Sequence, residues 1–140
     1  MHSLSKFFMA TALIFTSQLG YAQVVVVGAK SPATTLSKDQ VAALFLGKST
    51  QLPGAGIPVL YDHLEAAEIR QQFYTKVTDK TPSQVKAVWS RLVFSGKGSP
   101  PKEVASSADV KKAVNANPDA VGYIEKSAVD SSVKVVFSAD

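Results

Sequence analysis

The sequence predicts an α/β domain in which helices flank a mixed sheet of about four to five strands. Two observations lead to this prediction. Short β-branched, apolar segments alternate along the chain with segments whose apolar residues recur at helical spacing. The composition, with 46% hydrophobic and 19% charged residues in a chain of 140, is typical of one globular domain.

The N-terminal segment is predicted to be a cleaved secretory signal peptide. Lys6 supplies a positive charge, residues 7–15 form an apolar run, and Gly20-Tyr21-Ala22 is a small-x-small cleavage site. The run is too short to span a membrane, which takes about 20 apolar residues, so an uncleaved anchor is the less favoured alternative. We expect cleavage after Ala22, which leaves residues 23–140 as one domain exported to the periplasm.

The first strand is expected at residues 24–27, an unbroken valine run that ends at Gly28. Ser37 and Gln40 have the spacing of a capping box, which predicts that a helix begins there. Gly47 is placed to end this helix in a left-handed conformation.

The middle of the chain predicts one strand and two helices. A strand is expected at residues 57–61, where Pro58 favours its start or a sheet edge. Helical spacing of apolar residues follows at residues 65–77. A threonine cap, an N1 proline and an N3 glutamine begin a further helix over residues 81–92, with Trp89 on its apolar stripe as a core residue.

The last third predicts a loop, a helix and two strands. Residues 95–101 form a Gly/Pro-rich loop, and a helix capped by Ser106 or Ser107 is expected to run to Ala116, where Asn117-Pro118 stops it. Apolar runs then predict strands over residues 120–124 and 133–137.

The sequence carries no enzymatic machinery, and we expect a protein without a cofactor or a metal ion. The absence of cysteine excludes thiol catalysis and thiolate metal sites, and no G-x-S-x-G motif is present. The net charge of +4 is spread singly, unlike a nucleic-acid footprint. His63 is the only histidine beyond residue 22, and we interpret it as a surface or loop histidine because no partner motif accompanies it.

One segment has the composition of an anion-binding loop. It combines hydroxyls, flexible backbone amides and one cation, which together can wrap an anion, in Ser95, Gly96, Lys97, Gly98 and Ser99. The segment lacks the spacing of a nucleotide P-loop, and an ordinary surface loop remains the alternative.

Three segments, taken in order and spacing, resemble the phosphate-type periplasmic substrate-binding proteins of ABC transporters. Residues 36–48 resemble that family's helix-to-"IFsGK" segment, and residues 117–124 resemble its "NPgaIGYv" strand. Lys30-Ser31-Pro32 stands where the family often has Asn-Pro. The resemblance implies a single lobe of a type II periplasmic-binding-protein-like fold, from a short, single-domain branch. It also implies a non-enzymatic domain that binds phosphate or a related small anion for transport or sensing.

The resemblance also directs attention to the family's anion-gripping turn, in which an arginine and three further residues precede Ser-Gly-Thr-Arg. In this chain His63 takes the place of the first arginine, Ala67, Glu68 and Ile69 replace Ser-Gly-Thr, and Arg70 is retained. Ser31 is added because ligands of α/β sheets bind at sheet-end loops. The candidate ligand residues are therefore Ser31, His63, Arg70, Ser95, Gly96, Lys97, Gly98 and Ser99.

Two readings of the function stay open. The first is an anion-binding domain, acting alone or as a homodimer that rebuilds a two-walled cleft. The second is a protein-interaction module of the cell envelope that kept the scaffold and lost anion binding. A basic, concave surface around residues 63–70 would favour a ligand, and a flat, apolar one would favour a protein partner.

The predicted signal peptide makes a direct test. Full-length protein expressed in a Gram-negative host should be recovered from the periplasm with Gln23 as its first residue. Replacing the small residue at the cleavage site, Ala22→Phe, should leave the precursor uncleaved, as mass spectrometry would show. Recovery of the uncleaved chain with unaltered Ala22 would contradict the prediction.

Overall fold

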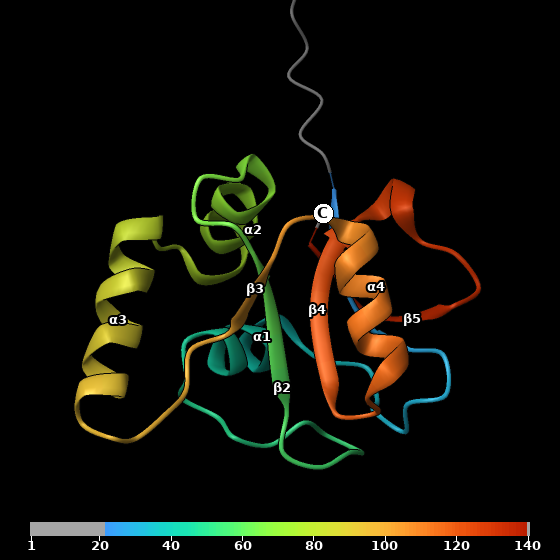
Figure 1. Ribbon diagram of the computed structural model, residues 1–140, viewed down its shortest axis with the longest axis horizontal. Coiled ribbons are helices and arrows are strands. Elements are labelled where there is room, and N and C mark those ends of the chain that lie inside the picture. Colours follow the sequence, from blue (N-terminus) through green and yellow to red (C-terminus); the bar gives the residue numbers. More distant parts are fainter. Residues whose placement is uncertain (1–21, 140) are drawn as a thin grey trace, which may run out of the picture.

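The computed structural model describes residues 22–139, which form one five-stranded mixed sheet with helices on both faces (Figure 1). The strand order is β3-β2-β4-β1-β5. Strand β2 runs parallel to β3 and β4, whereas β1 runs antiparallel to β4 and β5. The strands are β1 (Gln23–Gly28), β2 (Val59–His63), β3 (Lys102–Val104), β4 (Ala120–Glu125) and β5 (Val133–Ala139).

The helices begin and end at the residues that carry capping chemistry. Capping boxes at Ser37 and Thr81 are both formed, as predicted, and Gly47 follows the first helix with a φ of +70°. The helices are α1 (Lys38–Phe45), α2 (Glu68–Thr78), α3 (Pro82–Phe94), α4 (Ser107–Ala116) and the 3₁₀ turn η1 (Lys126–Ala128).

The valine run of β1 lies between two hydrophobic cores. Val25 and Val27 pack with α1, α2 and α3, and Val24 and Val26 pack with α4. Because successive side chains of a strand point to opposite faces, a strand buried on both sides reads as a continuous apolar run. Trp89 of α3 is buried, as predicted, and its indole N–H donates to the Phe45 carbonyl at 2.8 Å.

The sequence did not predict β3, and the predicted bounds of β2 and α2 differ from those in the structure. Strand β3 has three residues, two of them exposed, so it has too little apolar character to be recognised. Strand β2 extends to His63 rather than ending at Tyr61, because its last two polar residues are buried against the neighbouring strand. Helix α2 begins at Glu68 rather than residue 65, since residues 64–67 form the intervening turn.

The predicted signal peptide, residues 1–22, lies outside the described residues except for Ala22. Among residues 22–139, the longest helices are too short or too polar to cross a bilayer.

Close approach of α4 to the end of β1 requires a glycine at position 28. A Cβ there would lie 2.4 Å from the backbone oxygen of Val114, so Gly28→Ala must displace the helix. We expect a loss of about 1–3 kcal/mol in the free energy of unfolding, measured with urea. Gly98→Ala is the matched control, because its Cβ would meet side-chain atoms at an ordinary 3.5 Å. Equal stability of the two variants would contradict the packing argument.

Candidate functional site

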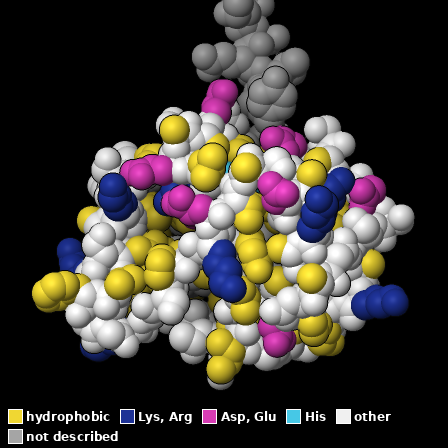
Figure 2. Space-filling view, viewed as in Figure 1, with side chains coloured by type: hydrophobic (Ala, Val, Ile, Leu, Met, Phe, Trp, Pro, Cys, Tyr) yellow, Lys and Arg dark blue, Asp and Glu magenta, His cyan; other side chains and the backbone are white. Residues whose placement is uncertain are grey.

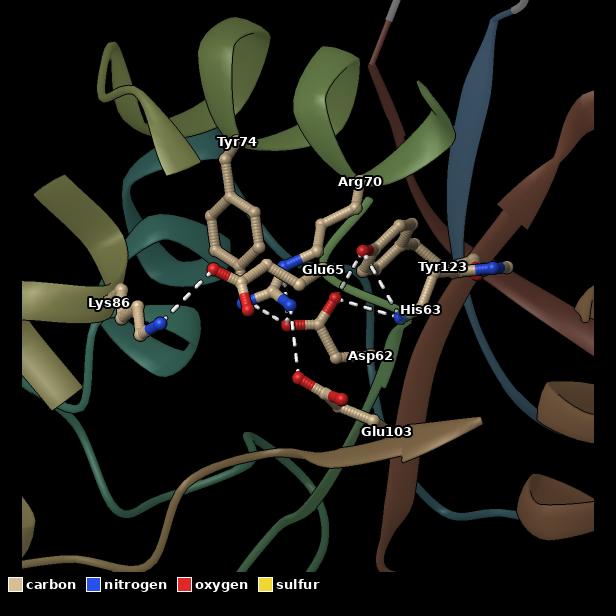
Figure 3. Close-up of polar contacts among 8 residues, drawn as sticks. All are labelled: Asp62, His63, Glu65, Arg70, Tyr74, Lys86, Glu103 and Tyr123. Atoms are coloured by element: carbon tan, nitrogen blue, oxygen red, sulfur yellow. Dashed lines mark hydrogen bonds and ion pairs between the residues drawn. The ribbon is translucent and has the colours of Figure 1, made fainter. Parts of the chain in front are cut away.

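Two carboxylates meet where the parallel strands β2 and β3 end. Asp62 and Glu103 are register partners on these strands, and Arg70 of α2 approaches both (Figure 3). In open α/β sheets ligands bind outside the carboxyl ends of the strands, so this edge is where a site is expected.

Asp62 is a buried acceptor for groups from three elements. Its Oδ2 accepts the Tyr74 hydroxyl at 2.6 Å, and its Oδ1 accepts the Tyr123 hydroxyl and the backbone N–H of His63, the latter at 2.8 Å. The Nε of Arg70 lies 3.6 Å from Oδ2. A carboxylate can be held in the interior only when its oxygens are satisfied in this way.

Arg70 is the arginine retained from the family's anion-gripping turn, and two carboxylates of its own chain already balance its charge. Its Nη1 donates to Glu103 at 3.1 Å, and its guanidinium lies 5.7 Å from the centre of the Tyr74 ring. Burial by itself lowers the pKa of Arg70, but the neighbouring charges, that of Asp62 foremost, raise it above its usual value. The fixed positive charge therefore serves two carboxylates of its own chain.

For the two tyrosines, burial and the charge of Asp62 act on the pKa in the same direction. Burial raises the pKa of Tyr74 and of Tyr123, and the charge of Asp62 raises both further. Both hydroxyls thus stay protonated and act as donors to Asp62. The Tyr123 ring also stacks on Phe73 at 3.8 Å between centroids, which fixes the hydroxyl in place.

His63 is not the surface histidine that the sequence suggested. It is the last residue of β2, only 3% exposed, and its Nε2 donates to the Tyr123 carbonyl at 2.8 Å. Because Nε2 donates to a backbone oxygen of β4 and the ring is buried, the imidazole supports the pairing of β2 with β4.

A hollow of about 410 Å³ opens at this edge, and we call it the strand-end hollow. Its charged lining contains three acids against two bases: Asp62, Glu65, Glu103, Arg70 and Lys86. The opposite wall is apolar and belongs to α3 and the loop after it, with Trp89, Val93, Phe94, Pro100 and Pro101. The surface around residues 63–70 is therefore concave but acidic, which disfavours an anion.

A second hollow, of about 390 Å³, lies at the opposite ends of the same strands, and we call it the loop hollow. Lys97, Gly98 and Ser99 of the predicted anion loop line it. Ser49 and Thr50 of the loop after α1 join them, and no local pattern marked these two residues in the sequence. Lys102 of β3 also borders this hollow, but its ammonium lies over the Tyr61 ring, on the α4 face of the sheet. The described lining therefore offers the ammonium of Lys97 and no carboxylate.

The other predicted site residues lie elsewhere. Ser31 is buried, donates to the Pro118 carbonyl at 2.9 Å and lines a separate hollow between β1 and α4. Ser95 donates to the Leu92 carbonyl at the end of α3, and Gly96 takes a left-handed φ of +71° with open space around it. The structure thus divides the predicted residues among several places and brings together Lys97, Gly98 and Ser99.

No group of three or more histidine, aspartate or glutamate side chains within residues 22–139 is placed to hold a metal ion.

Comparisons with known proteins identify the fold. No protein-family model and no curated protein matches the sequence. An ABC-type phosphate transport receptor from Vibrio cholerae is similar, with a TM-score of 0.65 and 22% identity over 82% of this chain and 45% of the receptor. A Clostridium perfringens protein solved with bound phosphate gives 0.66 and 21% over 82% and 44%. PstS from Borrelia burgdorferi gives 0.54 and 12% over 82% and 46%.

The predicted resemblance is confirmed at the level of the fold. The chain has the α/β fold of phosphate-transport binding proteins and spans less than half the length of the three solved relatives. Those relatives are described as a transport receptor, a phosphate-bound protein and PstS. At these identities the likeness establishes the architecture, and the site must be judged on its own residues.

Asp62 and the hydroxyls of Tyr74 and Tyr123 form a group that we call the Asp62 cluster. This cluster should make the folded domain less stable at alkaline pH. Tyr74 and Tyr123 keep their protons in the folded domain, because burial and Asp62 raise their pKa, but lose them above about pH 10 when the chain unfolds. The unfolded state then binds fewer protons, so the free energy of unfolding falls as pH rises, by about 1.4 kcal/mol per pH unit for each tyrosine.

Tyr123→Phe should remove about half of the fall in the free energy of unfolding with pH that the two tyrosines cause. Urea titrations between pH 9 and pH 11.5 would measure this. The ring and its stacking on Phe73 are kept. Tyr61→Phe is the control, since Tyr61 lies outside the Asp62 cluster and beneath Lys102. A slope unaffected by Tyr123→Phe would refute the role assigned to the cluster.

Proposed function

We propose that this protein is a non-enzymatic, extracytoplasmic binding domain that holds a small phosphate-like anion in the loop hollow. The observation that carries the proposal is the lining, in which Lys97 stands beside the hydroxyl residues Ser49, Thr50 and Ser99 and no carboxylate is present. A phosphate needs positive charge together with hydroxyl or amide donors, and this hollow offers both.

The charges of the strand-end hollow argue against the same role there. Arg70 is paired with Asp62 and Glu103, and Glu65 is paired with Lys86 at 3.4 Å. An incoming anion would face these carboxylates, with a repulsion of about 1–4 kcal/mol for each charge at 4 Å. Helix α2 also begins with Ala67, which makes no side-chain cap, and Glu68, so its first turn adds negative charge and no hydroxyl.

The fold supports a role in anion binding, and the size of the chain limits its strength. One of the solved relatives holds phosphate, and another is a phosphate transport receptor. Because this chain spans less than half of either, a single copy presents one wall, and an open site with one exposed lysine binds weakly. Export through the predicted signal peptide would place the site outside the cytoplasm, where it would act in transport or sensing.

Isothermal titration of residues 23–140 with inorganic phosphate, at low salt and pH 7, tests the proposal. The segment suits the experiment because both hydrophobic cores lie within it. We expect saturable binding at micromolar to millimolar phosphate that Lys97→Ala weakens by about fivefold, the contribution of an exposed ion pair. Lys102→Ala should change the affinity much less, because the Lys102 ammonium lies over the Tyr61 ring on the other face of the sheet. Added NaCl should weaken the binding of phosphate.

Arg91→Ala removes the same charge from an exposed position outside the loop hollow and should leave the affinity unchanged. Arg70→Gln, checked for folding by circular dichroism, distinguishes the two hollows. Loss of binding on Arg70→Gln, with the lysine variants unaffected, would place the anion at the strand-end hollow instead. No heat up to about 10 mM phosphate would overturn the proposal.

A further inference from the structure

We infer that the strand-end hollow is occupied by Phe94 of a second copy of this chain, in a two-fold symmetric dimer. The inference concerns a surface other than the loop hollow and stands whether or not an anion binds there.

The first observation is an aromatic side chain with no partner in its own domain. Phe94, the last residue of α3, is 97% exposed, and Val93 beside it is 47% exposed. Only Val85 and Trp89 of this helix are buried, so its C-terminal half stands beyond the edge of the sheet (Figure 1). A large apolar side chain left in water at an ordered position is typical of an interface.

The second observation is that the strand-end hollow, one wall of which is apolar, lies next to Phe94. The strand-end hollow has a volume of about 410 Å³, within the range of about 300–1,000 Å³ seen for ligand pockets, so it has room for an aromatic side chain. Hydrophobic side chains gather in the gap between α3 and β3 (Figure 2). Phe94 lies at the rim of this hollow and leaves it unfilled.

The charges of α3 are complementary to those of the strand-end hollow, which favours a second copy of this chain as the occupant. Helix α3 contains basic residues, Lys86 and Arg91, and no acidic one. The facing wall of the hollow carries the half-exposed Glu65 and Glu103, beside the buried Asp62. Arg91 precedes Phe94 by three residues, so both lie on one face of the helix, and Arg91 makes no ion pair with any residue of the described part. An apolar side chain accompanied by a cation is what an apolar hollow with an acidic wall accepts.

One surface therefore presents both the inserting side chain and its receptor. This is the condition for a closed, isologous dimer, in which each copy contributes Phe94 to the hollow of the other. The contact is small and has a charged rim, so we expect reversible association with a Kd of about 10–100 µM. Each hollow is complete only when the second copy supplies its aromatic side chain.

Sedimentation velocity of residues 23–140, from about 10 µM to about 1 mM, tests the inference. We expect a monomer–dimer equilibrium that Phe94→Asp weakens at least tenfold. Because Phe94 is 97% exposed, the substitution should leave the far-UV circular dichroism and the unfolding midpoint unchanged. Ile57→Asp is the matched control, a 77% exposed apolar side chain of the loop hollow, and should leave association intact.

Charge-reversal variants test the electrostatic part of the dimer contact. Arg91→Glu should weaken the dimer, and adding Glu65→Arg should restore part of the association, because the second change reverses the facing wall. A monomer at every concentration would overturn the inference and leave the hollow to a different protein. A dimer that Phe94→Asp leaves unchanged would overturn it as well. Neither outcome bears on phosphate binding, which the titration of the lysine variants decides separately.

Discussion

The buried carboxylate of Asp62 is the constraint on which the site depends. An ionised oxygen pair in the interior must be satisfied, and here the hydroxyls of Tyr74 and Tyr123 and the guanidinium of Arg70 do so. These groups come from α2 and β4, so one side chain ties helix, sheet and edge together. Glu103 extends the same network to β3 through Arg70. Removing Asp62 would leave the buried guanidinium with the half-exposed Glu103 as its counter-charge.

This network changes what the scaffold can do. An arginine at the carboxyl end of a sheet is well placed to hold an anion, but only if its charge is available. Arg70 is 8% exposed and faces two acids of its own chain, so its charge stabilises the joint between α2, β2 and β3. The chain thus has the fold of phosphate-transport binding proteins, and a lysine without an ion pair among the described residues, Lys97, lies in the loop after α3.

Local signals made the fold predictable from the sequence, and long-range contacts made the site unpredictable. Some elements are determined by only a few neighbouring residues: the strand by the valine run at residues 24–27, and two helix starts by the capping boxes at Ser37 and Thr81. The structure confirmed all three. The partners of His63 and Arg70 lie 60 and 33 positions away in the sequence, so their burial and pairing carry no local signature. Strand β3 is defined by its pairing with β2 and by no pattern of its own.

The two hollows divide the charges of one edge of the domain. The strand-end hollow gathers acids at the carboxyl ends of β2 and β3, and the loop hollow at the amino ends of the same strands contains Lys97 and no acid. Trp89 and Pro100 line both, so the end of α3 and its loop form a shared wall. A wall that is apolar and basic suits an anion on one side and an acidic protein surface on the other. The proposed anion site and the proposed dimer contact do not compete, because each uses a different side of α3.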